Sequence, residues 1–329
     1  MNKKIALVTG ASGFVGSHLA DLLLEKGFEV RALVRKTSSL KWLEGKNIEI
    51  HDCGFFDADG LREAVKGVDY VFHVAGVVRA KTPKEFYRGN VETTKNLLEA
   101  ILEVNPNLER LLVVSSFAAN GPAKDETGAK EDDEPHPISQ YGKSKLEEEK
   151  LVKKYYDKLP ITIVRPPAVY GERETDIYLF FKTFKSGLMT MVGFDKKLVS
   201  LVHAVDLVEG IFLAATNENS KSEIYYVGSE KFYTWDEIGD ATAKAFGKDA
   251  LRIKIPHFIV YIIGAIAQFF SLFSKRPATF NFEKAREFVQ KYQICDTSKA
   301  VRELGYRQKI SLESGIKRTV DWYKEMKWL

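Results

Sequence analysis

The sequence has little cysteine, no long apolar run and no block of like charge. Its two cysteines among 329 residues, Cys53 and Cys295, share no metal-binding or redox spacing. We therefore expect free thiols, no metal site and a reduced, cytoplasmic chain. The 49 basic and 45 acidic residues are spread without a cluster that could follow a phosphate backbone, which argues against a nucleic-acid partner.

No segment is long and apolar enough to predict a membrane span. The longest candidate, residues 258–273, is interrupted by Gln268 and Ser271 and falls short of the roughly 20 residues that a span requires. We interpret it as a buried or interface helix, with contact at a membrane surface as the alternative. At the N-terminus, glycines interrupt the apolar stretch before a signal-peptide core could form, so we expect a first strand there.

What is present in the first half is an alternation of short β-rich runs with helical patterns. This alternation predicts an α/β fold of the Rossmann type, a doubly wound parallel sheet with helices on both faces. The predicted strands cover roughly 4–9, 28–34, 47–51, 68–74, 109–115 and 160–165, and the predicted helices 14–26, 58–66, 83–104 and 139–158.

The second half has a different character. After about residue 166 the elements become shorter and mix with aromatic clusters. We predict a dinucleotide-binding domain over 1–165, which also takes in about 196–216, and a smaller, interleaved substrate-binding lobe over most of 166–329. The polar segment 122–139, with three prolines and six carboxylates, is expected to be a solvated loop, with a functional lid as the alternative.

A glycine loop joins the first predicted strand to the first predicted helix. Its sequence, GASGFVG at 10–16, places Gly10 at the tight turn, Gly13 where a backbone can approach a pyrophosphate, and Gly16 where the helix packs on the strand. The helix N-terminus then offers free amides and partial positive charge to phosphate groups. This context predicts dinucleotide binding.

The end of the second predicted strand indicates which dinucleotide. Where an acidic residue would hold the adenosine ribose of NAD, this chain has Arg35 and Lys36, and Lys41 is a possible third cation. A guanidinium can grip a 2′-phosphate that a carboxylate would repel. We therefore expect NADP, with NAD as the alternative.

Three residues are candidates for proton transfer at the carboxyl edge of the predicted sheet. Tyr141 and Lys145 are four residues apart and share one face of a predicted helix, so an ammonium can stand beside a phenol and favour its ionised form. Ser116 ends the fifth predicted strand and projects at the carboxyl edge, where ligands bind. Capping of the strand end is the structural alternative for this serine.

These motifs together resemble the extended short-chain dehydrogenase/reductases, the NAD-dependent epimerase/dehydratase superfamily. The resemblance covers nearly the whole chain and is most like dihydroflavonol reductases and 3β-hydroxysteroid dehydrogenases. It includes HVAG at 73–76, NVETT at 90–94, YGKSK at 141–145, RPPAVYG at 165–171 and the closing CDTSKA at 295–300.

The resemblance implies roles for individual residues. Tyr141 would be the general acid/base, Ser116 would polarise the substrate oxygen, and Lys145 would bind the nicotinamide ribose. Asp52 and Cys53 would flank the adenine, and Asn90 would brace the site. The full set expected to bind the cofactor is Gly10, Ser12, Gly13, Phe14, Val15, Gly16, Arg35, Lys36, Asp52, Cys53, Val74, Ala75, Gly76, Ser115, Tyr141, Lys145, Pro166 and Val169.

The predicted function is an NAD(P)-dependent oxidoreductase that interconverts a ketone and a secondary alcohol, with a small-molecule substrate that is apolar or ring-shaped. The alternatives are a nucleotide-sugar epimerase and a non-catalytic nucleotide-binding sensor. A dehydratase would need an Asp-Glu pair where Phe117 and Ala118 follow the serine, and many sugar-converting members carry tyrosine where this chain has Asn120.

Loops at the carboxyl edge supply the candidate substrate contacts. These are Arg79, Ala118, Asn120 and Tyr178, each of which could equally be a surface or packing residue. His203 and Asp206, in a segment similar to the family's later sheet-edge region, are expected to be structural. Helices near 83–104 and 139–158 resemble those through which members pair, so a homodimer is plausible.

Overall fold

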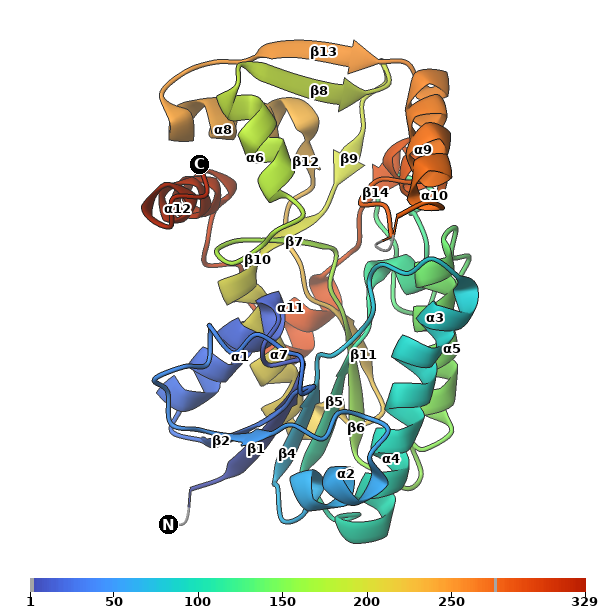
Figure 1. The fold of residues 1–329 in the computed structure, drawn as a ribbon, viewed down its shortest axis with the longest axis vertical. Coiled ribbons are helices and arrows are strands. Elements are labelled where there is room, and N and C mark those ends of the chain that lie inside the picture. The colour runs from blue at the N-terminus through green and yellow to red at the C-terminus, as the bar shows by residue number, and fades with distance from the viewer. Residues whose placement is uncertain (1–2, 275–276) are drawn as a thin grey trace.

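Figure 1 shows two lobes stacked along the long axis of the molecule in a computed structural model, which describes residues 3–274 and 277–329. The lower lobe contains a seven-stranded sheet in the order β11-β6-β5-β4-β1-β2-β3, and all its pairings are parallel. Its strands are β1 (Ile5–Thr9), β2 (Glu29–Leu33), β3 (Ile48–His51), β4 (Tyr70–His73), β5 (Arg110–Val114), β6 (Ile161–Arg165) and β11 (Ile224–Tyr226). The predicted Rossmann-type fold is confirmed.

Helices cover both faces of this sheet because successive strand residues point to opposite sides. Ala6 and Val8 of β1 pack into the core beneath α1 (Phe14–Glu25) and α7 (Ala204–Thr216), and Leu7 packs into the opposite core. That second core lies beneath α2 (Ala58–Val65), α4 (Thr93–Val104) and α5 (Gln140–Lys153). All six predicted strands and the first two predicted helices appear within about two residues of their expected positions.

Two predicted helices differ from the structure, and one of them, 139–158, ends earlier, at Lys153 of α5. The predicted helix 83–104 is divided into α3 (Pro83–Tyr87), a π-helical turn η1 (Arg88–Glu92) and α4. The division has a local cause, because the Asn90 side chain binds both backbone groups of Val77 and the Thr94 hydroxyl donates to the Asn90 carbonyl. The segment 201–207, which resembles the family's later sheet-edge region, forms β10 (Leu201–His203) and the start of α7, and the seventh strand of the sheet is β11.

The upper lobe is built from short strands and helices around an aromatic core. Two small sheets, β12-β9-β14 and β13-β8, lie beside the helices, and Phe181 and Tyr323 are buried between them. The elements are β7 (Ala168–Tyr170), α6 (Tyr178–Lys185), β8 (Leu188–Val192), β9 (Leu198–Val199), β12 (Tyr233–Thr234), α8 (Trp235–Phe246), β13 (Leu251–Ile255), α9 (His257–Ser271), α10 (Phe282–Phe288), β14 (Tyr292–Gln293) and α12 (Leu312–Glu325). η3 (Glu218–Ser220) and α11 (Ser298–Leu304) belong to the lower lobe, where η3 contacts β6 and α11 contacts α7 and β11.

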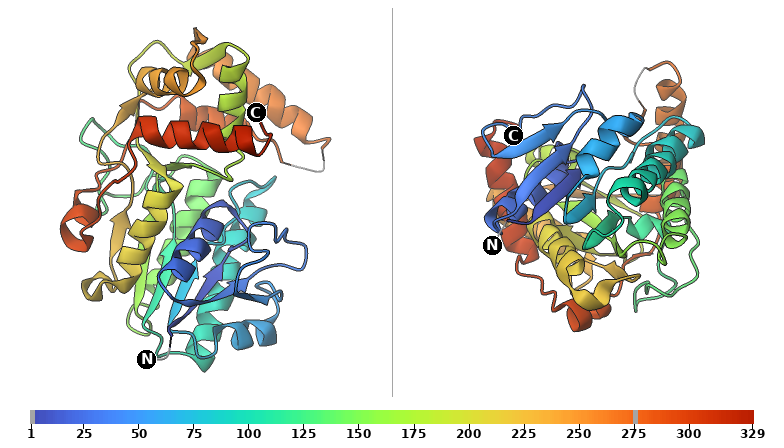
Figure 2. Two further views of the ribbon diagram at one scale, coloured as in Figure 1. Left: turned by 90° about the vertical axis from the view of Figure 1, so that its left-hand side faces the viewer. Right: turned by 90° about the horizontal axis from the view of Figure 1, so that it is seen from below.

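The chain passes between the two lobes more than once. After β10 the chain returns to the lower lobe for α7 and β11, and it does so again for α11 (Figures 1 and 2). Residues 122–139 contain no helix or strand, in agreement with the predicted loop. Both cysteines are free thiols.

The apolar run near the C-terminal third forms α9, which stands at the outer edge of the upper lobe in Figure 1. Of the predicted buried or interface helix, the buried reading was wrong, since Val260 and Gly264 are its buried residues and most of its large side chains are exposed. The interface reading stays a prediction. The reason is that α10 covers just one side of it. Within the described ranges, no helix combines the length and apolar character that crossing a bilayer demands.

Candidate active site

The glycine loop forms a turn that other residues could not occupy. Gly10 has a φ of +70°, and a Cβ there would lie 2.9 Å from the Ala75 backbone. A Cβ on Gly16 would lie 2.2 Å from the Gly10 carbonyl oxygen, so the first turn of α1 rests directly on the loop. Gly13 is the N-cap of α1 and no side chain caps the helix there. The exposed amides of this N-terminus therefore fit a diphosphate.

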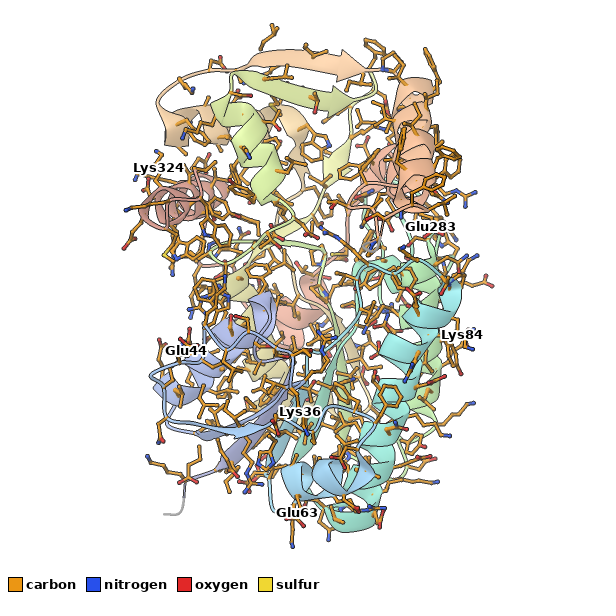
Figure 3. The ribbon with its side chains drawn as sticks, viewed as in Figure 1. Lys36, Glu44, Glu63, Lys84, Glu283 and Lys324 are labelled. Atoms are coloured by element: carbon orange, nitrogen blue, oxygen red, sulfur yellow. The ribbon has the colours of Figure 1, made fainter. Side chains whose placement is uncertain are left out.

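Basic residues follow β2 at the same edge of the sheet. Arg35 and Lys36 are both exposed, and Figure 3 shows Lys36 in front of the sheet in the lower lobe. Arg35 pairs in a β-bridge with Cys53, next to the exposed Asp52. Lys41, the possible third cation, instead lies over the Trp42 ring at 4.2 Å from its centroid. Two exposed cations thus stand just after the carboxyl end of β2.

The fold brings Ser116 close to the helix that carries Tyr141 and Lys145. Ser116 precedes η2 (Phe117–Ala119), which packs against the start of α5. The approach is so close that a Cβ on Gly142 would lie 2.3 Å from the Ala118 carbonyl oxygen. The Ser116 hydroxyl accepts a hydrogen bond from the Ala118 amide at 3.1 Å, which leaves its own proton available to a substrate oxygen.

Lys145 is held at the carboxyl ends of β4 and β5. Its ammonium donates to the Val114 carbonyl at 3.0 Å, and a Cβ on Gly76 would lie 3.9 Å from Nζ. The side chain is 2% exposed and forms an ion pair with the fully buried Glu148. Burial raises the pKa of Glu148, although the adjacent Lys145 opposes that shift. The cation is thereby fixed beside the backbone segment that is expected to line the cofactor.

A chain of buried hydrogen bonds supports this pair. The Thr94 hydroxyl lies 2.8 Å from both Glu148 Oε1 and His73 Nε2, and His73 Nδ1 lies 2.8 Å from the Thr9 hydroxyl. Burial, aided by the charge of Lys145, lowers the pKa of His73 to about 3. His73 is therefore neutral at ordinary pH, and one of its nitrogens donates while the other accepts.

The neighbouring glutamate has a different partner. Glu149 binds the Arg165 guanidinium through two hydrogen bonds of 2.9 and 2.6 Å, and it also accepts from the Ser115 hydroxyl at 2.5 Å. All three side chains are buried. Ser115, expected from the resemblance to face the cofactor, thus links β5 to α5. Pro166 directly follows Arg165, and its carbonyl accepts a hydrogen bond from the Phe117 amide. This bond connects the end of β6 to the turn after Ser116.

Tyr141 opens onto a pocket whose other wall comes from the upper lobe. Val78, Arg79 and Phe86 line it from one side, and residues of α10 and the segment before it line the other. Among these are Lys284 and Glu287, which form a 2.8 Å ion pair. The proximity of Glu287 and Tyr141 raises the pKa of Lys284 despite burial. Sequence analysis missed this wall, because nothing local links residues 278–287 to Tyr141.

The predicted substrate contacts lie in different surroundings. Arg79 lines the pocket and forms an ion pair with Asp176, and Ala118 lies in the turn after Ser116. Asn120 is fully buried, and its side-chain amide has no hydrogen-bond partner among the described residues. The Tyr178 hydroxyl donates to the Trp328 carbonyl, within the aromatic cluster around Tyr323. Substrate contact by these four residues stays a prediction.

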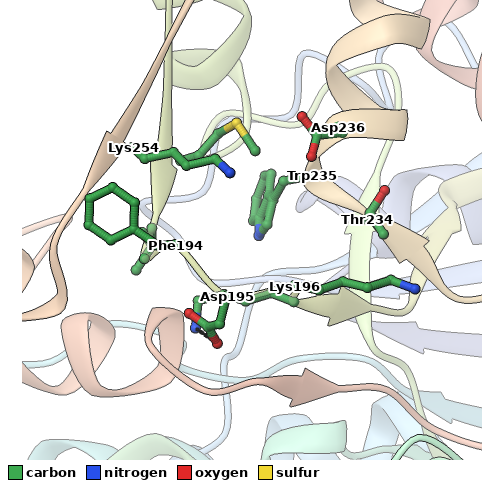
Figure 4. A pocket seen from close by; sticks show the side chains of 11 residues that line it. Phe194, Asp195, Lys196, Thr234, Trp235, Asp236 and Lys254 are labelled. Carbon is green, nitrogen blue, oxygen red and sulfur yellow. Dashed lines mark hydrogen bonds and ion pairs between the residues drawn. The ribbon is translucent and has the colours of Figure 1, made fainter.

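A second pocket lies in the upper lobe and is lined by none of the predicted site residues. It lies between β8, β13 and α8, and its lining includes Phe194, Trp235, Asp236 and Lys254 (Figure 4). His203 caps α7 and Asp206 accepts from the Lys309 and Ile310 amides, both structural arrangements. Among the described residues, no group of three or more histidine, cysteine, aspartate or glutamate side chains could hold a metal ion.

The fold and the glycine turn together define an α/β protein built to hold a dinucleotide. The family model "NAD dependent epimerase/dehydratase family" matches residues 6–228, and the chain belongs to this family of NAD-dependent enzymes. The expected membership is thereby confirmed, while the more specific likeness to dihydroflavonol reductases is not.

Similar proteins span nearly the same length. The chain is 28% identical to a ceramide reductase of Caulobacter vibrioides, over 99% of this chain and 96% of that protein. It is 26% identical to the N-acetyl-alpha-D-glucosaminyl-diphospho-ditrans,octacis-undecaprenol 4-epimerase of Escherichia coli O157:H7, with 98% and 96% covered. The crystal structure of gox2253 superposes with a TM-score of 0.82 at 28% identity, covering 98% of this chain and 99% of that one.

Proposed function

We propose that the chain is an NAD(P)-dependent oxidoreductase that interconverts a ketone and a secondary alcohol carried on an apolar, lipid-like molecule. The observation that supports this most directly is that the turn after Ser116 packs against the start of α5, the helix that carries Tyr141 and Lys145. The Lys145 ammonium lies near Gly76, and the glycine loop closely approaches the adjacent Ala75. Ser116, Tyr141 and Lys145 each occupy a position that matches the family's proton-transfer residues.

The chain's own side chains would transfer the proton and orient the substrate. In the direction of reduction, the Ser116 hydroxyl donates a hydrogen bond to the carbonyl oxygen, and the Tyr141 hydroxyl delivers its proton to that oxygen. Lys145 would hold the nicotinamide ribose and stabilise the phenolate that remains. The glycine loop would hold the dinucleotide, whose chemistry is to provide a hydride for the carbonyl carbon.

NADP is the proposed cofactor. Arg35 and Lys36 stand exposed at the end of β2, where a 2′-phosphate would lie, and a guanidinium binds phosphate through paired hydrogen bonds. Arg35→Asp is therefore expected to weaken NADPH binding selectively, measured as the ratio of NADPH to NADH dissociation constants. An unchanged ratio would contradict the assignment.

An apolar substrate is supported by two kinds of observation. The Tyr141 pocket has Val78, Ala80 and Phe86 on one wall, and apolar linings with a few polar anchors are typical of small-molecule sites. Two similar proteins, the ceramide reductase and the undecaprenol-linked epimerase, are named for lipid or lipid-linked substrates. The second of these favours an epimerase as the alternative function.

A single-turnover assay separates the candidates. NADPH or NADH is mixed with long-chain ketones, steroid ketones and nucleotide sugars, and cofactor absorbance is followed. Net cofactor oxidation by a ketone supports the proposal, and sugar inversion without net oxidation supports the epimerase. Tyr141→Phe is expected to lower the reductase rate about 10²- to 10⁴-fold. Cofactor binding with no reaction on either panel would favour a nucleotide-binding sensor.

A further inference from the structure

The outer face of α9 is an exposed apolar surface without a partner in the described chain. Its large side chains are between 45% and 78% exposed; we call this set the α9 face, and it consists of Phe258, Ile262, Ile263, Ile266, Phe269, Phe270, Leu272 and Phe273. Contiguous apolar surface of this kind marks an interaction site in a soluble fold. The α9 face is therefore a docking surface that the proposed chemistry does not by itself require.

The helix is firmly seated on its inner side, so its exposure is a property of the fold. A Cβ on Gly264 would lie 2.8 Å from the Asn281 carbonyl oxygen and 3.0 Å from Ala285 Cβ. The Tyr261 and Phe282 rings lie 5.3 Å apart. Close contact with α10 thus fixes which side of α9 faces outward.

Exposed lysines border the α9 face. Lys254 of β13 forms no ion pair with a described residue, whereas Arg252 on the same strand is paired with Asp236 and Asp240. In the segment 78–84, the exposed Lys81 ammonium donates to the Ser274 carbonyl just beyond α9, and Lys84 is also exposed. Figure 3 shows Lys84 of this segment on the same side of the molecule as α10. An apolar stripe bordered by cations complements an anionic lipid surface.

We propose that the α9 face docks the protein onto an anionic lipid bilayer, with α9 lying in the interface. A helix of 15 residues is about 22 Å long at 1.5 Å per residue, too short for a hydrocarbon core of about 30 Å. Lying flat, it can insert its phenylalanine and isoleucine side chains below the headgroups while the flanking cations contact lipid phosphates.

The bilayer surface would then lie beside the entrance to the Tyr141 pocket. The chain that leaves α9 contributes Ala278, Thr279 and Asn281 to the pocket wall, and Lys284 follows in α10. A substrate held in the membrane could pass from the lipid to Tyr141 without crossing bulk water. This part of the inference rests on the proposed function, whereas docking itself does not.

A second copy of the chain is a weaker candidate for the same surface. A symmetric dimer through α9 would bring the two copies of Lys81, which binds the Ser274 carbonyl at the end of this helix, toward each other. Like charges brought together across an interface are repulsive. The charge around the α9 face therefore favours an anionic partner over a copy of itself.

Vesicle co-sedimentation tests the proposal with the full-length chain. Wild-type protein is expected to pellet with phosphatidylglycerol/phosphatidylcholine vesicles, and less with phosphatidylcholine alone or in 0.5 M salt. The variant Phe269→Glu/Phe270→Glu should bind at least about tenfold more weakly because two charges would enter the apolar layer. Leu179→Glu, a substitution at an equally exposed apolar residue on α6, is the matched control and should bind as wild type.

Two results would overturn the proposal. The first is failure of the wild-type protein to bind either kind of vesicle, whatever the variants do. A wild-type dimer by light scattering that the double variant converts to monomer, without vesicle binding, assigns the face to a second copy. Reduction of a short, water-soluble ketone should be equal in the double variant and wild type. Loss of vesicle binding with intact reduction therefore separates this inference from the proposed function.

Discussion

Helices α5 and α9 have opposite relations between polarity and burial. Helix α5 is rich in charged residues, yet Lys145, Glu148 and Glu149 are buried. Helix α9 is almost entirely apolar, yet just two of its residues are buried. Figure 1 shows where this difference arises, because α5 lies beside α4 and shares with it the core on one face of the sheet, while the main contact of α9 with the described elements is with α10.

Each departure from the usual pattern has its own physical explanation. A buried charge is costly unless it is paired, so the charges of α5 persist because Arg165 and the Lys145–Glu148 ion pair compensate them. An exposed apolar face gains nothing inside the fold, so its retention indicates contact with something outside it. Polarity in the interior thus marks the candidate active site, and apolarity at the surface marks the docking face.

The largest effect is expected from breaking the buried pair between α5 and β6. Arg165→Met would leave Glu149 charged and uncompensated, and we expect a loss of about 3–5 kcal/mol in the free energy of unfolding, measured in urea. The double variant Arg165→Met/Glu149→Leu is the control. Because no charge is then buried alone, it should recover much of the loss, and a double variant no more stable than the single one would contradict the argument.

A pH dependence is expected from the buried histidine beside the Lys145–Glu148 pair. Burial lowers the pKa of His73 to about 3, whereas an unfolded histidine titrates near 6.5. As the pH falls through this window, the unfolded chain takes up a proton that the folded chain cannot accept. Stability should therefore fall toward acid pH, by up to about 1.4 kcal/mol per pH unit for this group.

Urea unfolding of His73→Gln across this pH range measures the contribution, and its curve should be flatter than that of wild type. His136→Gln, at an exposed position in the 122–139 loop, serves as the control and should retain the wild-type slope. Equal slopes in all three proteins would mean that His73 becomes protonated in the folded state as readily as in the unfolded chain.

The sequence predicted most of the sheet and of the candidate active site around α5, because the signals for them are local. Glycines that end helices or shape the loop, such as Gly27 and Gly10, have positive φ values in the structure. The four-residue spacing of Tyr141 and Lys145 needs just one helix to bring them together. The strands of the sheet were equally accessible, since burial on both faces leaves short, continuous apolar runs, as in β4 and β5.

The rest depended on contacts between distant segments. Lys284 reaches the Tyr141 pocket from 143 positions further along the chain, and no spacing rule connects them. The π-helical turn at η1 arises from bonds between Asn90 and Val77. For α9, hydropathy identified an apolar helix but could not tell whether another element covers it, because coverage depends on where α10 packs.

A smaller effect should come from the inner side of α9. Gly264→Val places a side chain against the Asn281 backbone and is expected to cost about 1–3 kcal/mol through overpacking. Ala265→Val makes a similar change at the next, exposed position and should cost less than about 0.5 kcal/mol. Equal losses in thermal and urea unfolding would show that helix propensity, rather than contact with α10, decides the outcome.

The smallest effect is expected on the outer side of the same helix. Phe270→Ser should change the free energy of unfolding by less than about 0.5 kcal/mol, because the ring is 66% exposed. Phe184→Ser, where the ring is fully buried, should cost about 3–5 kcal/mol. A large loss at Phe270 would mean that the fold itself uses the α9 face, and the docking proposal would then lose its basis. An unchanged stability together with weaker vesicle binding would show that this phenylalanine acts through a partner, as the contrast with α5 implies.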